Sequence, residues 1–146
     1  MRGDCMKEKT INRIRRFNRF YLPEFDLLGN KYLGSEYSAT EARVLFEIFT
    51  NDGCTATAVA KTMKIDKSYL SRVIHNHEKK GYLYRTTSKI DCRAYELHLT
   101  DKGSDRVKDF INKSNEQIGK KIQRLTADDC QRLISALDTI TEVLEV

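Results

Sequence analysis

The stretch from Thr55 to Gly103 decides the fold of this chain, and it reads TATAVAKTMKIDKSYLSRVIHNHEKKGYLYRTTSKIDCRAYELHLTDKG. Two short helical patterns, over 55–63 and 67–80, are separated by a three-residue link that ends at Asp66, a good helix N-cap. Gly81 ends the second pattern, because glycine readily adopts the left-handed conformation that closes a helix. Two strand patterns and a new helix start follow. This order predicts a winged helix-turn-helix.

Apolar spacing within this stretch predicts which side of each element faces the core. In the helix over 67–80, the inward side is formed by residues at three- and four-residue steps. These are Leu70, Val73, Ile74 and His77. The two strands of the wing are expected at 82–85 and 94–99, with a tip at 86–93 between them.

The chain before this stretch predicts two further helical regions. Residues 7–33 carry apolar residues at helical steps with arginines between them, and Pro23 is expected to kink the helix or to start a new one. Ser38-Ala39-Thr40-Glu41 is a capping box for a helix that should end near Asn51. The residues of that helix expected to face inward are Ala42, Leu45, Phe46 and Phe49.

Two long helices are expected after the wing. Thr100 should cap a helix over 101–124, and Thr126 precedes another that runs to the end of the chain. Their apolar stripes are too extensive to be buried on one small winged lobe. We therefore expect a mainly α single domain over 1–146, in which a DNA-binding lobe with a two-stranded β-wing (38–100) is flanked by dimerisation helices (7–35 and 101–146).

Length and composition fit one globular domain, since the 146 residues are 40% hydrophobic and 32% charged. No apolar run approaches the ~20 residues of a membrane helix, and no signal sequence is evident, so a cytoplasmic protein is expected. The cysteines at 5, 54, 92 and 130 lack Cys-x-x-Cys spacing, which indicates reduced thiols. Because His75 and His77 point in different directions on a helix, neither a metal site nor another cofactor is expected.

Positive charge is concentrated in two parts of the chain. Residues 1–20 hold 7 basic and 2 acidic side chains, and residues 61–93 hold 9 and 3, while the net charge of the whole chain is +5. A basic patch on a folded domain is typical of a polyanion partner, although lysines and arginines can also simply solvate a helix face.

The helix that begins after Asp66 has the composition needed to read DNA. An α-helix fits the major groove, and hydroxyl and guanidinium groups on its first two turns can reach base edges. Arg72 is the candidate for a bidentate guanine contact, and lysines near the helix-turn-helix are candidates for phosphate contacts. Arg93 could enter the minor groove from the wing, with Asp91 holding its guanidinium. The candidate DNA-binding residues are Thr55, Thr57, Lys61, Lys64, Lys67, Ser68, Tyr69, Ser71, Arg72, His75, Lys89, Asp91 and Arg93.

The sequence resembles the MarR family of winged-helix transcription regulators over nearly its whole length. The resemblance is carried by the segments 38–45, 70–74, 78–85, 91–94 and 99–103, which read SATEARVL, LSRVI, EKKGYLYR, DCRA and LTDKG. The opening segment 14–21, IRRFNRFY, also resembles MarR domains that precede an acetyltransferase domain. No acetyltransferase is expected here, because the chain stops at Val146.

The resemblance implies a homodimer on a pseudo-palindromic operator, acting as a ligand-responsive repressor. Members of the family bind small aromatic or anionic effectors between the dimerisation helices and the DNA-binding lobes. Here Arg16, Phe17, Tyr21 and Phe25 could line such a site, or the aromatic residues could simply fill a dimer core.

Two residues depart from the family pattern. His77 stands where the family usually has leucine, and it should pack there only while neutral, so acidification is expected to weaken the recognition helix. Cys92 stands at the wing tip where a basic residue is common, which adds an oxidisable thiol.

Two other classes of function compete with a DNA-binding regulator. A non-enzymatic protein-interaction module could keep the winged fold, but it would not need the basic stretch over 61–93. An enzyme is not expected, because we find no nucleophile with its base, no glycine-rich phosphate loop and no paired carboxylates.

Overall fold

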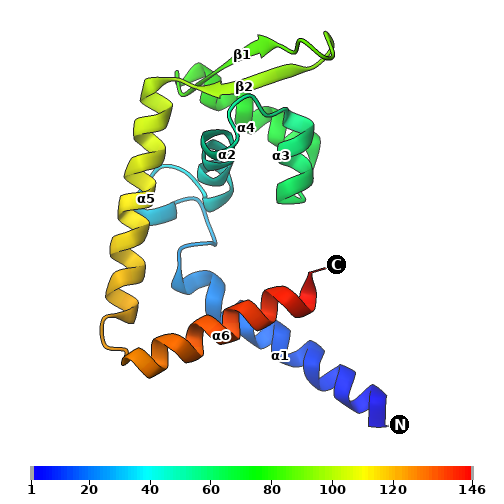
Figure 1. The fold of residues 1–146 in the computed structure, drawn as a ribbon, viewed down its shortest axis with the longest axis vertical. Helices are drawn as coiled ribbons and strands as arrows, with labels where there is room; N and C mark the ends of the chain where they lie inside the picture. The colour runs from blue at the N-terminus through cyan, green and yellow to red at the C-terminus, as the bar shows by residue number, and fades with distance from the viewer. Residues whose placement is uncertain (1, 146) are drawn as a thin grey trace.

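The computed structural model describes residues 2–145 and has two distinct ends (Figure 1). One end holds three short helices and a β-hairpin, and the other holds the first and last helices. The long helix α5 runs between the two ends. The elements in chain order are α1 (Arg2–Glu24), the 3-10 turn η1 (Tyr32–Gly34), α2 (Ala39–Thr50), α3 (Ala56–Met63), α4 (Lys67–Lys79), β1 (Leu83–Thr87), β2 (Tyr95–Leu99), α5 (Asp101–Ile122) and α6 (Ala127–Leu144).

The expected winged helix-turn-helix is confirmed, and its boundaries follow from local capping. Ser38 accepts a hydrogen bond from the Glu41 amide at 3.1 Å, while the Glu41 carboxylate accepts one from the Ser38 amide at 3.0 Å, which completes the capping box. Hydroxyl or carboxylate oxygens cap four later helices in the same way. These caps are Thr55 for α3, Asp66 for α4, Thr100 for α5 and Thr126 for α6. Gly81 has a φ of 81°, as the end of the recognition helix requires.

The wing is a two-stranded antiparallel sheet with Leu83 opposite Leu99 and Thr87 opposite Tyr95. The first strand extends two residues beyond the expected 82–85, because the ladder continues through Thr86 and Thr87. An isolated bridge between Cys54 and Leu97 adds the start of the α3 region to the edge of this sheet. The wing is therefore fixed to the lobe at the base and projects at its tip.

The core lies within the lobe, between α2, α4, the wing and the first half of α5. Leu45, Leu70 and Leu97 are completely or almost completely buried. The four residues expected to face inward from α4, including His77, are all buried. Gly103 allows α5 to start directly against the backbone just before β1, because a Cβ at this position would lie 2.0 Å from the backbone oxygen of Tyr82.

The expectation of one helical region over 7–33 is wrong. The helix starts earlier, at Arg2, and ends at Glu24, one residue after Pro23. Proline lacks the amide hydrogen needed for the helix to continue regularly. Asp26 and Gly29 have positive φ values of 55° and 81°, so the segment between α1 and η1 cannot be helical.

The inward face expected for α2 is only partly correct. Ala42 and Leu45 are buried, but Phe46 and Phe49 are each 37% exposed. The buried arc of α2 is instead completed by Val44, Glu47 and Ile48. Phe46 instead lines a hollow between α2 and α5, which leaves part of its ring accessible.

The helices at the far end leave their apolar sides largely unburied. Neither α1 nor α6 contains a buried residue. In α6 the exposed apolar side chains include Leu133, Leu137, Ile140, Val143 and Leu144. Within residues 2–145, no helix is both long enough and apolar enough to cross a membrane.

Candidate nucleic-acid interface

One hollow of about 350 Å³ brings together the start of α3, the start of α4 and the wing. Residues that are far apart in the sequence therefore meet at one surface. Six of the thirteen candidate DNA-binding residues line this hollow, namely Thr55, Thr57, Lys67, Ser71, Asp91 and Arg93. The others lie on the same elements or next to them, with Lys61 in the last turn of α3, Lys64 at its C-cap and Lys89 in the wing tip.

Helix α4 presents a polar face to solvent because its apolar face is anchored in the core. Ser68, Ser71, Arg72 and His75 are exposed, and Tyr69 is half-buried. The Arg72 guanidinium lies over the Tyr69 ring, 5.9 Å from the ring centroid, which restrains the long arginine side chain. Hydroxyl and guanidinium donors are thus displayed on the first two turns of a rigid helix.

At the start of α3 the two threonines have different roles. The Thr55 hydroxyl accepts a hydrogen bond from the Ala58 amide at 3.2 Å, so it serves as the helix cap. Thr57 is exposed and its hydroxyl has no such bond within the described residues. Lys64 ends the helix with a φ of 53°, and this turn sets the short link to α4. Of the two threonines, Thr57 is the one with a free hydroxyl for a phosphate.

The expectation that Asp91 holds the Arg93 guanidinium is wrong. The Asp91 carboxylate instead accepts a hydrogen bond from the backbone amide of Arg93 at 3.0 Å. The hydroxyl of Ser88 also accepts weak hydrogen bonds from the amides of Ile90 and Asp91, each at 3.3 Å. Aspartate commonly stabilises turns through such backbone bonds. Asp91 therefore shapes the tip, and the Arg93 side chain stays free of it.

Two residues of the hollow, Arg85 and Tyr95, were not among the expected site residues. The Arg85 Nε donates a hydrogen bond to Glu78 of α4 at 2.9 Å, and its guanidinium lies 5.8 Å from the centroid of the Tyr95 ring. Arg85 thereby connects the end of the recognition helix to both strands of the wing. The only sequence signal was a basic residue in a strand, which does not by itself indicate what it faces.

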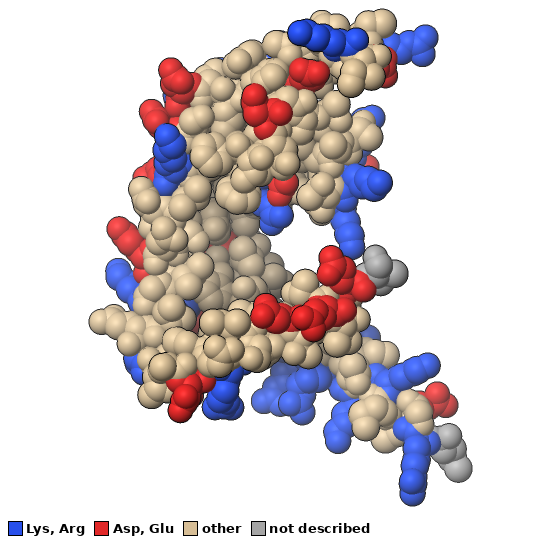
Figure 2. Space-filling view, in the orientation of Figure 1, with Lys and Arg blue, Asp and Glu red and all other residues tan. Residues whose placement is uncertain are grey.

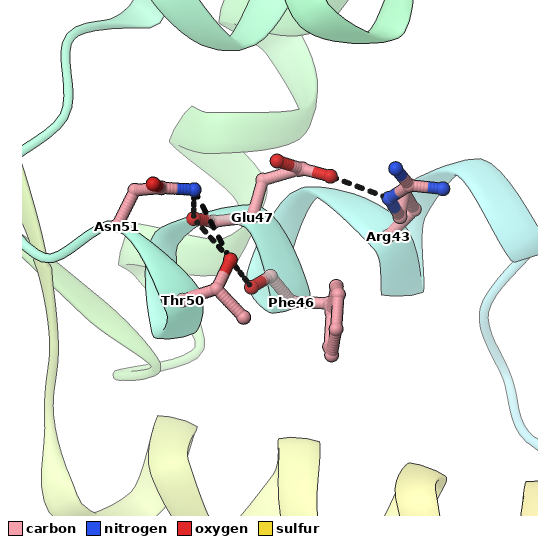
Figure 3. A network of polar contacts seen from close by, with 5 residues as sticks. All are labelled: Arg43, Phe46, Glu47, Thr50 and Asn51. Atoms are coloured by element: carbon pink, nitrogen blue, oxygen red, sulfur yellow. Dashed lines mark hydrogen bonds and ion pairs between the residues drawn. The ribbon is translucent and has the colours of Figure 1, made fainter.

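Polar contacts at the end of α2 fix the loop that leads into α3 (Figure 3). The side chains of Thr50 and Asn51 donate hydrogen bonds to the Glu47 carbonyl at 3.3 and 3.2 Å. The buried Glu47 carboxylate accepts one from Arg43 Nε at 2.6 Å. In the following turn, Asp52 lies 2.8 Å from Nδ1 of His98, which ties the turn to the wing.

The four candidate effector residues do not meet around one cavity. Phe17, Tyr21 and Phe25 stack in sequence, with ring centroids 5.2 and 4.8 Å apart, and Arg16 is exposed on α1. A separate cavity of about 490 Å³ lies between α2, α5 and the end of α3, and none of the four residues lines it. Its lining includes Tyr32, Arg43, Phe46, Phe110 and Ser114.

The cysteines show no sign of a built redox or metal site within residues 2–145. All four are free thiols, and burial raises the pKa of the Cys54 thiol, which favours its protonated form. Across the same residues, no group of three His, Cys, Asp or Glu side chains could hold a metal ion.

Known proteins share this architecture. The most similar solved structures include a mutant MarR from E. coli complexed with operator DNA, with a TM-score of 0.73 and 22% identity over 90% of this chain and 95% of that one. Another is Streptococcus pneumoniae FabT in complex with DNA, with a TM-score of 0.70 and 22% identity over 98% and 97% of the two chains. At this level of identity the likeness establishes the fold.

Sequence comparisons find similarity over part of the chain. The chain is 30% identical over 78 residues to the HTH-type transcriptional regulator BilQ of Clostridioides difficile (strain CD3), a match that covers 52% of this chain and 53% of that protein. The chain spans about half the length, or less, of the curated relatives it matches. The MarR family profile matches residues 37–95, which hold α2, the helix-turn-helix and most of the wing. The segment of the chain that forms the core of the lobe is thus similar to the MarR family, and the winged architecture around it is that of solved MarR structures.

Proposed function

We propose that this chain is a sequence-specific DNA-binding transcription regulator that acts as a homodimer. Each lobe, over residues 38–100, would occupy one half-site of a pseudo-palindromic operator. The observation that carries this proposal is the hollow between α3, α4 and the wing, where exposed lysine, arginine and hydroxyl side chains converge. Such a concentration of cations and donors matches the phosphates and base edges of duplex DNA.

Different residues of the interface would contact the bases and the phosphates. Arg72 would read a guanine, and a bidentate contact of this kind is worth about 1–3 kcal/mol of discrimination. Lys61, Lys64 and Lys67 would contact phosphates and position the lobe. Arg93 would enter the minor groove from the wing tip, whose shape is set by Asp91.

Dimerisation is supported by the unburied apolar sides of α1 and α6. Exposed apolar stripes of this extent are typical of a protein interface. We place the dimerisation region in residues 7–35 and 101–146, of which α1 and α6 lie at the end opposite the wing (Figure 1). The dimer would then hold two lobes at a fixed separation, as a palindromic operator requires.

Effector control is supported by the 490 Å³ cavity, whose volume lies in the range of small-molecule sites. Its walls come from the lobe and from α5, so a ligand there would contact both parts that must move relative to each other. The aromatic rings of Tyr32, Phe46 and Phe110 suit an aromatic ligand, and Arg43 suits an anionic group on it. A ligand that changed the lobe spacing would release DNA, which is the behaviour of a ligand-responsive repressor.

The proposal is tested by selecting bound duplexes from a random pool. The affinity for the selected duplex is then measured as a function of salt concentration. A dimer with six or more phosphate contacts should lose roughly a thousandfold in affinity between 50 and 200 mM salt. The selection is then repeated with small aromatic acids present. If no duplex binds in a salt-sensitive way, the DNA-binding function is abandoned and a protein-interaction module becomes the better account.

A further inference from the structure

The proposed function uses the apolar side of α1 in the dimer but leaves the basic residues of this helix without a role. Residues 1–20 carry 7 basic and 2 acidic side chains, and all described residues of this segment are exposed. In Figure 1, α1 lies at the end of the molecule opposite the wing and the helix-turn-helix. Figure 2 shows Lys and Arg side chains along the outer edge of α1, well separated from those of the lobe. The DNA held by the lobe cannot account for them.

Helix α1 carries most of its apolar residues on one side and most of its basic residues on the other, with Lys7 among the apolar residues and Phe20 among the basic ones. With about 100° of rotation per residue, Ile11, Ile14, Phe17 and Tyr21 share one side. The basic side of α1, as we name it, lies opposite Ile11, Ile14 and Tyr21. It consists of Lys9, Arg13, Arg16 and Arg19, with Arg13 at its edge beside Phe17. None of these four cations takes part in an ion pair with the residues that the structure describes.

The proposed dimer decides which side of α1 remains available. Ile11, Ile14 and Phe17 are 49%, 40% and 37% exposed, and a dimer interface would cover them. The basic side would then stay in solvent as an unpaired row of cations. Successive cations at three- and four-residue steps are about 4.5–6 Å apart along the helix axis. Duplex DNA carries one negative charge per roughly 1.7 Å of its axis, so its phosphates are spaced closely enough to pair with every cation in the row.

We propose that the basic side of α1 binds the phosphate backbone of a second DNA segment while the lobes hold the operator. This inference rests on the proposed function, in which the chain forms a homodimer that binds an operator. Charge complementarity selects a polyanion as the occupant. A membrane is a weaker fit, because an amphipathic helix binds a bilayer through its apolar side, and the dimer covers that side. The consequence is that one regulator dimer bridges two DNA segments.

A two-duplex capture assay on the full chain tests this proposal. The protein is loaded at low salt onto an immobilised duplex and washed, and a fluorescent duplex of unrelated sequence is then added. Wild-type protein should capture the second duplex. The triple variant Lys9→Gln/Arg13→Gln/Arg19→Gln keeps the helix-forming composition and the apolar side. It should load like wild type but capture at least about tenfold less of the second duplex, since non-specific binding depends on such charges.

A matched variant removes the same number of charges from the lobe. Lys61→Gln/Lys64→Gln/Lys67→Gln should reduce loading onto the first duplex, and this result tests the proposed function separately. The inference about α1 is overturned if the α1 variant captures the second duplex as well as wild type does. It is equally overturned if wild type captures none, or if wild type binds vesicles of anionic lipid through these residues without capturing DNA.

Discussion

His77 is a buried ionisable residue inside a recognition helix. It is 1% exposed, and its Nε2 donates a hydrogen bond to the Glu41 backbone carbonyl at 2.9 Å. Its Nδ1 is buried and has no partner among residues 2–145. The rings of Tyr37 and Tyr82 enclose it, with centroids 5.3 and 5.9 Å away. Desolvation therefore lowers the pKa of His77, although its hydrogen bond to the Glu41 backbone opposes this.

The lowered pKa of His77 predicts a loss of stability in acid. Its stabilising contribution is complete above the unfolded pKa of about 6.5. It declines as pH falls below that value, because the unfolded chain then binds a proton that the folded chain resists. Chemical denaturation at pH 7 and pH 5 should show a smaller decrease for His77→Leu than for wild type. Exposed His75, changed to Gln, serves as the control and should behave like wild type. The same pH profile of DNA binding in His77→Leu and wild type would exclude His77 as a pH-sensitive element.

Substitutions at Arg72 and Lys61 distinguish contacts to DNA bases from contacts to DNA phosphates. If Arg72 contacts a guanine, Arg72→Ala should relax selection at one operator position and cost about 1–3 kcal/mol for the preferred site. Lys61→Ala should weaken binding to all sequences alike and reduce the slope of the salt dependence by about one. Binding to a panel of single-base operator variants measures both effects. Unchanged base preference in Arg72→Ala would show that another residue reads that base.

Residue types predicted which face of the recognition helix is buried, but not how polar side chains pair. Spacing placed Leu70 and His77 inside and Arg72 outside, because helical periodicity fixes direction. It could not show that Asp91 bonds to the backbone of Arg93, since this depends on the conformation of the wing tip. It also missed the contact of Arg85 with Glu78 and Tyr95, which requires the strand register and the angle between wing and helix.

At the scale of elements, helix starts were easier to predict than the path between helices. Ser38, Asp66 and Thr100 each cap the helix expected from the sequence, because a cap is a local interaction. The end of α1 at Glu24 was missed because the following segment retains apolar residues at helical spacing. Its positive-φ residues, such as Asp26, are set by tertiary packing and by the Gln117 contact to that carboxylate.

Gly103 is predicted to be essential for joining α5 to the wing. An added Cβ would lie 2.0 Å from the Tyr82 oxygen and 2.9 Å from its carbonyl carbon, so the backbone would have to move. We expect Gly103→Ala to lower the free energy of unfolding by about 3 kcal/mol or more. Gly119→Ala is the control within the same helix, because its Cβ would meet no atom within 4 Å. That variant should be stabilised by roughly 0.5–1 kcal/mol. Equal stability of the two variants in denaturant titrations would contradict the close approach.

Across the whole molecule, α5 is the element that connects the winged lobe with the end where we propose dimerisation (Figure 1). Its first turns pack into the lobe through Val107 and Phe110, while Ile118 and Ile122 remain 41% and 38% exposed. The same helix forms a wall of the 490 Å³ cavity. Under the proposed effector control, we therefore expect a ligand in the cavity to act on the lobe through α5.

If the dimer forms through the far end, a charge introduced on the apolar side of α6 should disrupt it, and a charge on the polar side should not. Leu137 is 41% exposed in the single chain, so a glutamate there costs little unless a partner covers it. We expect Leu137→Glu to give half the wild-type mass by light scattering at micromolar concentration. Operator affinity should fall by about a hundredfold or more, because the two lobes would no longer bind as a linked pair. Thr139→Glu adds the same charge on the polar side of α6 and should keep both mass and affinity. If Leu137→Glu retains the dimer mass, α6 does not form the interface, and if wild type is already a monomer, the paired-lobe arrangement is wrong.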